Sequence, residues 1–213
     1  NLPGKLSIGG SCGTAGYVMC TNGSGCIGWT SIAGASGGVT CVATGNTHVG
    51  DGSMSNVVAL SAIHNTAYGY HAMCSLTCGN TNTAIGSLTL DALTTGNDNT
   101  AIGYATLSTV TTGIRNTAVG RSALVNNSAS YNTGVGYSAL ACNTSGTGNN
   151  AFGYSAMYYN TTGSCNTAVG NAALQDNTTG CLNTAVGYNA AYNNTTGCEN
   201  VAIGRNALCC NST

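Results

Sequence analysis

The chain has 213 residues, of which only 4% are charged, and its formal net charge at pH 7 is −1. Ordinary globular proteins have about 25% charged residues, so the scarcity of charge itself restricts function. Nucleic-acid binding is excluded, because it needs clustered cations and the four present are dispersed: Lys5, Arg115, Arg121 and Arg205.

Disorder and membrane insertion are also disfavoured. Disordered chains combine low hydrophobicity with high net charge, whereas 42% of these residues are apolar. No apolar run approaches the roughly 20 residues of a membrane span. Residues 1 to 45 contain no repeat and carry Trp29. We expect them to form a small N-terminal β module, separate from the remainder of the chain.

From residue 46 onward the chain repeats one phrase. Ten copies open at Asn46, Asn65, Asn82, Asn99, Asn116, Asn132, Asn149, Asn166, Asn183 and Asn200. Successive copies are 17 residues apart, except for a step of 19 after Asn46 and a step of 16 after Asn116. A fixed period of this kind is typical of stacked repeat architectures. The sequence therefore predicts a repeat domain over residues 46 to 213.

The repeated unit reads N-T-A-V-G-Y-x-A-L-x-x-N-T-T-G-x-x, and its 17 positions are numbered from the first Asn. Positions one to five resemble a short strand, and N-T-T-G supplies a corner in which Asn and Gly tolerate left-handed backbone angles. A long helix is disfavoured because the unit has no extended amphipathic stretch and Gly recurs throughout. We predict an all-β chain, a β-solenoid of about ten coils that stack about 4.8 Å apart into a rod about 50 Å long.

In such a stack, identical positions form columns along the rod. Position four gives a column of large apolar residues: Ile85, Ile102, Val119, Val135, Phe152, Val169, Val186 and Ile203. Position nine gives a second column: Leu107, Leu124, Leu140, Met157, Leu174 and Leu208. We interpret Leu93 as a member of this column that is displaced by two residues. Positions three and four face opposite sides of a strand, so one face can fill the interior while the other meets a neighbouring chain. The alternative is a monomer whose alanine face is exposed.

The twelve cysteines predict disulfides in an oxidising, extracellular setting. The candidates are Cys12, Cys20, Cys26, Cys41, Cys74, Cys78, Cys142, Cys165, Cys181, Cys198, Cys209 and Cys210. Cys181 and Cys198 share position sixteen of adjacent coils, so their Cα atoms should lie about 5 Å apart, within disulfide range. A zinc site at Cys74 and Cys78 is the rival interpretation, but no second Cys or His pair completes the pattern.

Sequons of the form N-x-[ST] are glycosylation acceptors in secreted proteins. The candidates are Asn22, Asn126, Asn143, Asn160, Asn177, Asn194 and Asn211, and Asn193 also fits the motif. Asn143, Asn160, Asn177, Asn194 and Asn211 share position twelve, and we expect them on one exposed edge. The alternative is an unmodified ladder of stacked Asn side chains at a turn, hydrogen-bonded along the axis.

Residues for catalysis or metal binding form no recognisable motif. The histidines are His48, His64 and His71, and the nearest acids are Asp51 and Asp91. All lie in or near the most irregular coils, where tolerated polar substitutions explain them without a nucleophile, base and orienting acid. The acidic residues do not follow the calcium-loop pattern D-x-[DN]-x-[DN]-G. The sequence predicts no enzyme activity, no cofactor and no metal.

The phrase N-T-A-[VI]-G-x-x-A-L over residues 65 to 208 resembles coils of trimeric autotransporter adhesin heads. It is still more similar to repeats in fibre proteins of phages and large algal viruses. GTAGYVMCTNGSGCIGWTSI, residues 13 to 32, resembles the G-x-x-G-Q-V-L-x-S-N-G-x-G-x-x-x-W module of tail-fibre-like proteins, with Trp29 as apolar anchor. Tyr17 stands where Gln is usual, and Cys20 and Cys26 are departures. The resemblance implies a left-handed β-roll in a rod-like fibre at a cell or virion surface.

These observations predict a structural subunit of an extracellular filament or fibre, built from copies of itself. The alternative is a receptor-binding or adhesive fibre of a phage, virus or bacterium that recognises a cell-surface glycan. The last repeat stops inside its N-S-T corner without a polar cap, which would leave strand edges open. We therefore expect the N-terminal module of one subunit to cover the last coil of the next, where Cys209 and Cys210 could form a covalent link.

Overall fold

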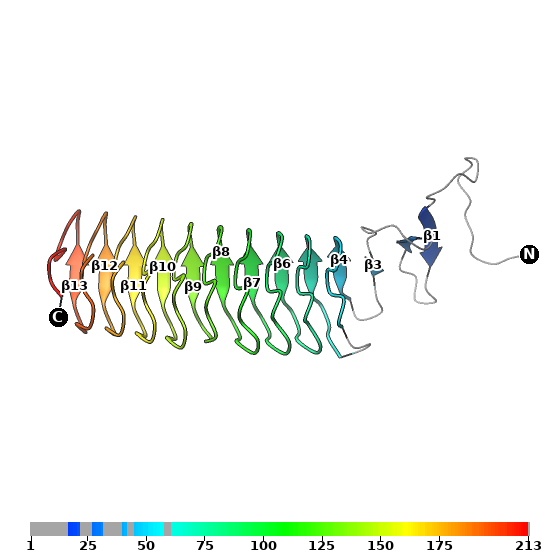
Figure 1. Ribbon diagram of the computed structural model, residues 1–213, viewed down its shortest axis with the longest axis horizontal. Coiled ribbons are helices and arrows are strands. Elements are labelled where there is room, and N and C mark those ends of the chain that lie inside the picture. Colours follow the sequence, from blue (N-terminus) through cyan, green and yellow to red (C-terminus); the bar gives the residue numbers. More distant parts are fainter. Residues whose placement is uncertain (1–16, 22–26, 32–39, 42–44, 58–60, 213) are drawn as a thin grey trace, which may run out of the picture.

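The computed structural model describes residues 17–21, 27–31, 40–41, 45–57 and 61–212, and in these ranges it contains strands and turns but no helix. β1 (Tyr17–Thr21) and β2 (Ile27–Ser31) form an antiparallel pair. The rest of the predicted N-terminal module falls largely outside the described residues. All remaining strands belong to a single sheet (Figure 1).

The large sheet runs in chain order from β3 to β13. Its strands are β3 (Thr40–Cys41), β4 (Thr47–Val49), β5 (Thr66–Tyr68), β6 (Thr83–Ile85), β7 (Thr100–Ile102), β8 (Thr117–Val119), β9 (Thr133–Val135), β10 (Asn150–Phe152), β11 (Thr167–Val169), β12 (Thr184–Val186) and β13 (Val201–Ile203). β3 pairs antiparallel with β4, and the ten strands from β4 to β13 are parallel. The predicted all-β solenoid is confirmed.

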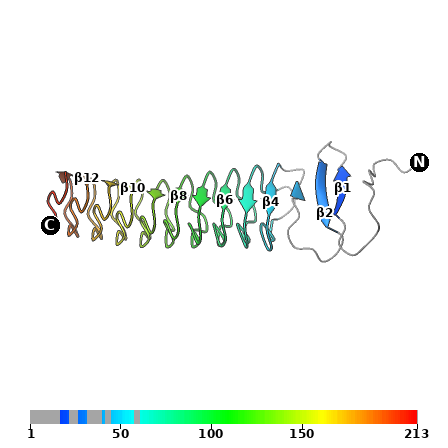
Figure 2. The ribbon, with the colours of Figure 1, turned by 90° about the horizontal axis from the view of Figure 1, so that it is seen from above.

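Each parallel strand pairs with the same three positions of the next repeat. Thr100 lies opposite Thr117, a step of 17, and the register survives the irregular repeats: Thr117 lies opposite Thr133 and Thr47 opposite Thr66. The extra or missing residues are therefore absorbed outside the strands. At about 4.8 Å per step the ten strands span roughly 45 Å, and both views show a straight rod (Figures 1 and 2).

The interior of the coil is narrow and is filled by small residues facing large ones. The central residue is Ala in eight of the ten parallel strands and points inward, and Ala101, Ala118 and Ala168 are completely buried. Across the interior, position nine is equally buried in the inner coils, as at Leu107 and Leu124, whereas Leu208 in the last coil is 46% exposed. The alternative interpretation, in which the alanine face is exposed, is wrong. Position nine already occupies the space opposite the strand, so only a methyl group fits there and the larger residue of position four must point outward.

Position nine of the third coil is Leu90, not Leu93. Leu90 is buried and its backbone N–H donates to the carbonyl of Thr106, next to Leu107, which sets its register. Leu93 belongs to position twelve, together with Leu76 and Val110, and all three are buried. Position twelve is thus a further interior column, apolar in the early coils and occupied by Asn in the later ones.

Position five is glycine in every coil, with φ between 116° and 141°. The α-hydrogen that stands in place of a Cβ atom at this position faces the next coil at very short range. A Cβ on Gly187 would lie 2.6 Å from the carbonyl carbon and oxygen of Gly204, whereas a Cβ on Gly204 would meet nothing within 4 Å. The glycine column therefore lets the corners of successive coils approach at the spacing set by the strands.

Comparison of Gly187→Ala with Gly204→Ala distinguishes the energetic effect of this contact from that of backbone strain. Both alanines would suffer the unfavourable positive φ, but only the Gly187 variant would press a methyl group against the next coil. We expect Gly187→Ala to lower the free energy of unfolding by about 2–4 kcal/mol more than Gly204→Ala. Denaturant unfolding of both variants measures the difference. Equal losses would contradict the coil-to-coil contact.

Candidate assembly surface

One flat side of the rod carries the outward side chains of the ten parallel strands. Position two contributes mostly Thr hydroxyls. Position four contributes a column that we call the outer column: Val49, Tyr68, Ile85, Ile102, Val119, Val135, Phe152, Val169, Val186 and Ile203. Ile85 is 40% exposed and Val186 is 37% exposed. Positions two and four contain no charged residue in any of the ten coils. An uncharged apolar strip on an uncovered parallel sheet is typical of a contact surface.

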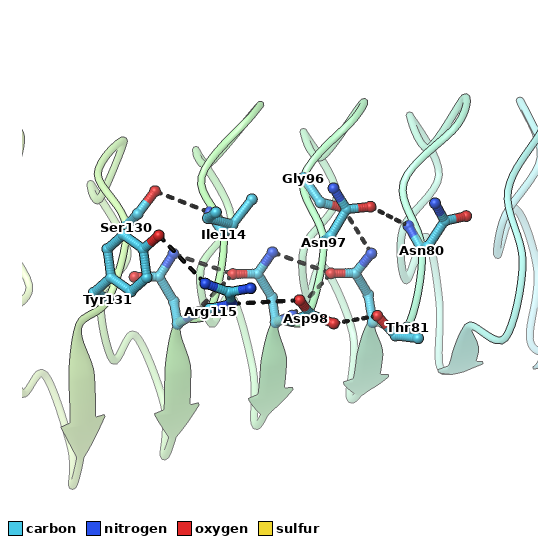
Figure 3. Close-up of polar contacts among 12 residues, drawn as sticks. Asn80, Thr81, Gly96, Asn97, Asp98, Ile114, Arg115, Ser130 and Tyr131 are labelled. Atoms are coloured by element: carbon cyan, nitrogen blue, oxygen red, sulfur yellow. Dashed lines mark hydrogen bonds and ion pairs between the residues drawn. The ribbon is translucent and has the colours of Figure 1, made fainter.

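The corner at positions sixteen and seventeen forms a polar edge (Figure 3). The backbone N–H of Asn80 donates to Oδ1 of Asn97, 2.8 Å away in the next coil. Arg115 Nε lies 3.6 Å from Asp98 Oδ2, and its Nη1 donates to the Tyr131 hydroxyl at 3.5 Å. The ion pair is well exposed, so it adds about 0–1 kcal/mol at most. These contacts run along the axis from coil to coil and therefore serve stacking.

The eight cysteines whose side chains the structure describes form no disulfide. Among the described side chains, those of Cys74, Cys78, Cys142, Cys165, Cys181, Cys198, Cys209 and Cys210 are all free thiols. Cys12 and Cys26 lie outside the described residues, as do the side chains of Cys20 and Cys41. The disulfide predicted between Cys181 and Cys198 is wrong in this structure, although their register is as expected.

The physical reason is that both thiols lean the same way along the axis. Cys198 Sγ accepts a hydrogen bond from the backbone N–H of Cys181 at 3.1 Å. Cys181 Sγ accepts in turn from the backbone N–H of Ser164 at 3.3 Å. Each sulfur thus caps the amide of the preceding coil, as Asn97 does elsewhere on this edge. A disulfide needs the two sulfurs to turn toward each other, which this column does not do.

The sequon row was expected on an exposed edge, and that prediction is wrong. Asn143, Asn160, Asn177 and Asn194 are buried inside the coil. A glycan cannot be accommodated on an amide that points into a packed interior, so these four are withdrawn as acceptors. Asn211 is partly buried, Asn126 and Asn193 are exposed, and Asn22 lies outside the described residues. Asn22, Asn126 and Asn211 stay candidate glycosylation sites.

The buried row instead forms a ladder of stacked Asn side chains that are hydrogen-bonded along the axis, which was the alternative interpretation of these sequons. Nδ2 of Asn160 donates to Oδ1 of Asn143 at 2.7 Å and to the Gly163 carbonyl at 2.9 Å. Oδ1 of Asn160 accepts from Nδ2 of Asn177 at 2.8 Å. The signal for burial was present in the sequence, because the same column holds Leu76, Leu93 and Val110 in earlier coils.

Asn160→Ala tests the energetic role of this ladder. The change removes hydrogen bonds to both neighbouring coils: the buried Asn143 oxygen loses its donor, and the Asn177 amide keeps only its bond to the Gly180 carbonyl. We expect a loss of about 2–4 kcal/mol in the free energy of unfolding. The matched control Asn126→Ala, at an exposed position, should cost under about 0.5 kcal/mol. A loss as small as that of the control would show that the ladder is not a stabilising element.

The candidate catalytic residues do not assemble a reactive group. His48 points inward at position three, its Nδ1 lies 3.0 Å from Ser53 Oγ, and burial lowers the pKa of its imidazole. The Ser53 hydroxyl donates its proton to the carbonyl of Gly50, whereas the hydroxyl of a nucleophilic serine donates to its general base. His71 stacks on Tyr70 with ring centroids 4.1 Å apart.

The backbone carbonyl of Asp51 accepts from the N–H of His71 at 2.9 Å, and Asp91 is the second acid near this group. Burial raises the pKa of its carboxyl, an effect opposed by two backbone hydrogen bonds and by the charge of His71. Within the described ranges, no group of three or more His, Cys, Asp or Glu side chains is placed to hold a metal ion. In the same part of the chain, no helix is long and apolar enough to cross a membrane.

The coil that opens at Asn200 is the last one in the structure, and its outer side is uncovered. Ile203 is 70% exposed, about twice the value of Val186 in the preceding coil. A further coil, from a second copy or from additional chain, would fit this end.

Two thiols lie at this end of the rod. Cys209 Sγ and Cys210 Sγ are 3.3 Å apart, and the hydrogen bond between them raises the pKa of the Cys209 thiol. The predicted covalent link to an incoming module stays a prediction. Comparison of the chain with protein-family models, with curated proteins and with solved structures finds no match. The resemblance to fibre and adhesin repeats therefore rests on the repeated phrase itself.

Proposed function

We propose that this chain is a structural subunit of an extracellular filament or fibre: a rigid rod that associates with copies of itself. The observation that carries the proposal is the outer column. It is uncharged, and five of its ten members are each about two-fifths exposed: Ile85, Ile102, Phe152, Val169 and Val186. A surface of that kind is costly to leave in water and well suited to a regular, repeating contact.

The dimensions of the outer face suit a lateral contact of modest area. Ten strands at about 4.8 Å give a length of roughly 45 Å, and three residues per strand give a width of about 10 Å. Two such faces would bury about 900 Å² in total, near the lower limit for a specific interface. Because no charge lies at positions two and four, two copies can approach without like-charge repulsion.

A contact along the axis is a second part of the proposal. β13 pairs on one side only, with β12, so its other backbone edge offers hydrogen-bonding groups to a further strand. An N-terminal segment of another subunit is our proposed occupant. The proposed extracellular or virion-surface location rests on the resemblance to fibre proteins. The described thiols, being free, do not add to its support.

An adhesive or receptor-binding fibre is the second candidate. It is favoured by a specific observation: exposed Tyr side chains recur at position six, beside the outer column, including Tyr104, Tyr137 and Tyr188. Exposed aromatic residues in rows are a common means of contacting glycans and partner proteins. The two functions are compatible, since a rod can both assemble and bind.

Charge placed on the outer column tests lateral association. The double variant Ile102→Lys with Val169→Lys would bring ammonium groups into an apolar contact, so association should weaken at least about tenfold. The matched control, Thr112→Lys with Thr179→Lys, adds the same charges to exposed corners of the same two coils. Sedimentation velocity over a concentration series measures both. A wild-type protein that stays monomeric, or a control that weakens association equally, would refute the proposal.

Deletion of residues 1 to 45 tests the axial contact separately. The shortened chain keeps every coil but loses the segment proposed to cover the open end, so it should form short rods. Electron micrographs of both proteins, prepared at equal concentration, give the length distribution. If long filaments still form after the deletion, the axial contact lies elsewhere.

A further inference from the structure

The tyrosines at position six form a column with two gaps. In chain order the column contains Tyr70, Ser87, Tyr104, Arg121, Tyr137, Tyr154, Asn171, Tyr188 and Arg205. Where two tyrosines follow each other, their rings stack along the rod: the centroids of Tyr137 and Tyr154 are 5.3 Å apart and the planes differ by 9°. The column thus has a ring spacing close to the coil spacing. Each gap is a place where a short side chain takes the position of a ring.

The two rings that flank the gap at Asn171, those of Tyr154 and Tyr188, each contact a further side chain on the side away from the gap. We call these two rings the walls of the gap. Tyr154 stacks on Tyr137 on one side of the gap. On the other side, the guanidinium of Arg205 lies 5.7 Å from the centroid of the Tyr188 ring. Tyr154 is 56% exposed and Tyr188 is 49% exposed. The two rings therefore have a neighbour on their outer sides and only the short, exposed Asn171 between them.

The backbone fixes the separation of these walls. The N–H of Ala172 donates to the Tyr154 carbonyl at 2.9 Å, and the N–H of Asn189 donates to the Asn171 carbonyl at 3.0 Å. Tyr154 and Tyr188 are consequently two coils apart, about 9.6 Å along the axis. A ring placed midway would lie about 4.8 Å from each wall, within the range of stacking contacts.

That width selects a particular ring shape. A flat aromatic ring midway would stack as Tyr154 does on Tyr137, but both separations exceed the roughly 3.5–4.0 Å at which dispersion contact is greatest. A pyranose chair is thicker, because axial hydrogens project from both faces. To stack on two walls at once it must carry its hydroxyls in equatorial positions, so that each face presents only C–H bonds. The β-gluco configuration satisfies this condition.

We propose that the gap at Asn171 is a binding site for a β-gluco-configured pyranose ring held between Tyr154 and Tyr188. Asn171, the exposed residue between the two tyrosines in the column, has an amide that can supply both a donor and an acceptor for the equatorial hydroxyls. The site does not depend on filament formation, so either proposal can fail without the other. It would give the rod a means of contacting glucose-containing glycans.

A second gap of the same kind lies at Ser87, between Tyr70 and Tyr104. The guanidinium of Arg121 lies 5.4 Å from the centroid of the Tyr104 ring, as Arg205 does at Tyr188. Ser87 offers a hydroxyl in place of the amide. The two gaps are separated by 84 residues, which is five coils or roughly 24 Å, so one extended glycan could contact both.

Saturation-transfer NMR on the full chain with methyl β-D-glucopyranoside as probe tests the site. With a wall on each face, irradiation of the Tyr ring protons should saturate both sets of axial sugar protons, those on C1, C3 and C5 and those on C2 and C4. Methyl β-D-galactopyranoside, with one axial hydroxyl, should bind at least about threefold more weakly. Transfer to only one set of protons, equal binding of the two sugars, or absence of transfer would overturn the proposal.

Substitutions that fill the gaps test the site without disturbing the fold. Asn171→Tyr with Ser87→Tyr should complete the column as Tyr137 and Tyr154 do, and abolish saturation transfer. Tyr188→Ala removes one wall and should leave transfer only from the Ser87 gap. The control Tyr131→Ala removes an exposed ring outside the column and should bind as the wild type does. Undiminished transfer in the filled variant, with its dichroism spectrum unchanged, would refute the site.

Discussion

The asparagine at position one holds each coil to itself and to its neighbour. Nδ2 of Asn99 donates to the Gly113 carbonyl at 2.8 Å, which closes its own coil, and to Oδ1 of Asn82 at 3.0 Å in the coil before. The backbone N–H of Asn99 donates to the same Asn82 oxygen at 3.0 Å. These groups are buried, so any slip of register would leave several of them without partners. The ladder therefore fixes the spacing on which the other columns depend.

With the coils closed this tightly, the interior has space for little else. Alanine faces Leu or Met inside, as at Ala168 and Leu174, and the β-branched residue of each strand must lie outside. The apolar outer column is thus a consequence of a thin coil. Charge is disfavoured along such a stack because every column repeats its chemistry at about 4.8 Å. The same repetition turns single substitutions, such as Asn171 among the tyrosines, into isolated and recognisable features of the surface.

The coil length, the all-β class and the strand register could be predicted, because a 17-residue period permits only one kind of stack. Which face of each strand points inward could not be predicted, since Ala and Val are both apolar and the choice depends on how much space position nine leaves. The burial of Asn160 was missed because Leu93 was assigned to position nine, which concealed the apolar members of position twelve. The spacing of Cys181 and Cys198 was right, but spacing alone does not tell which way a thiol turns.

Hydrogen exchange of side-chain amides measures the position-one ladder directly. Nδ2–H groups that are buried and hydrogen-bonded between coils exchange only when the coils open, whereas an exposed amide exchanges freely. By NMR, the side-chain amides of Asn99, Asn116 and Asn166 should exchange at least about a thousandfold more slowly than that of exposed Asn126. Exchange as fast as that of Asn126 would show that the ladder does not hold the coils together.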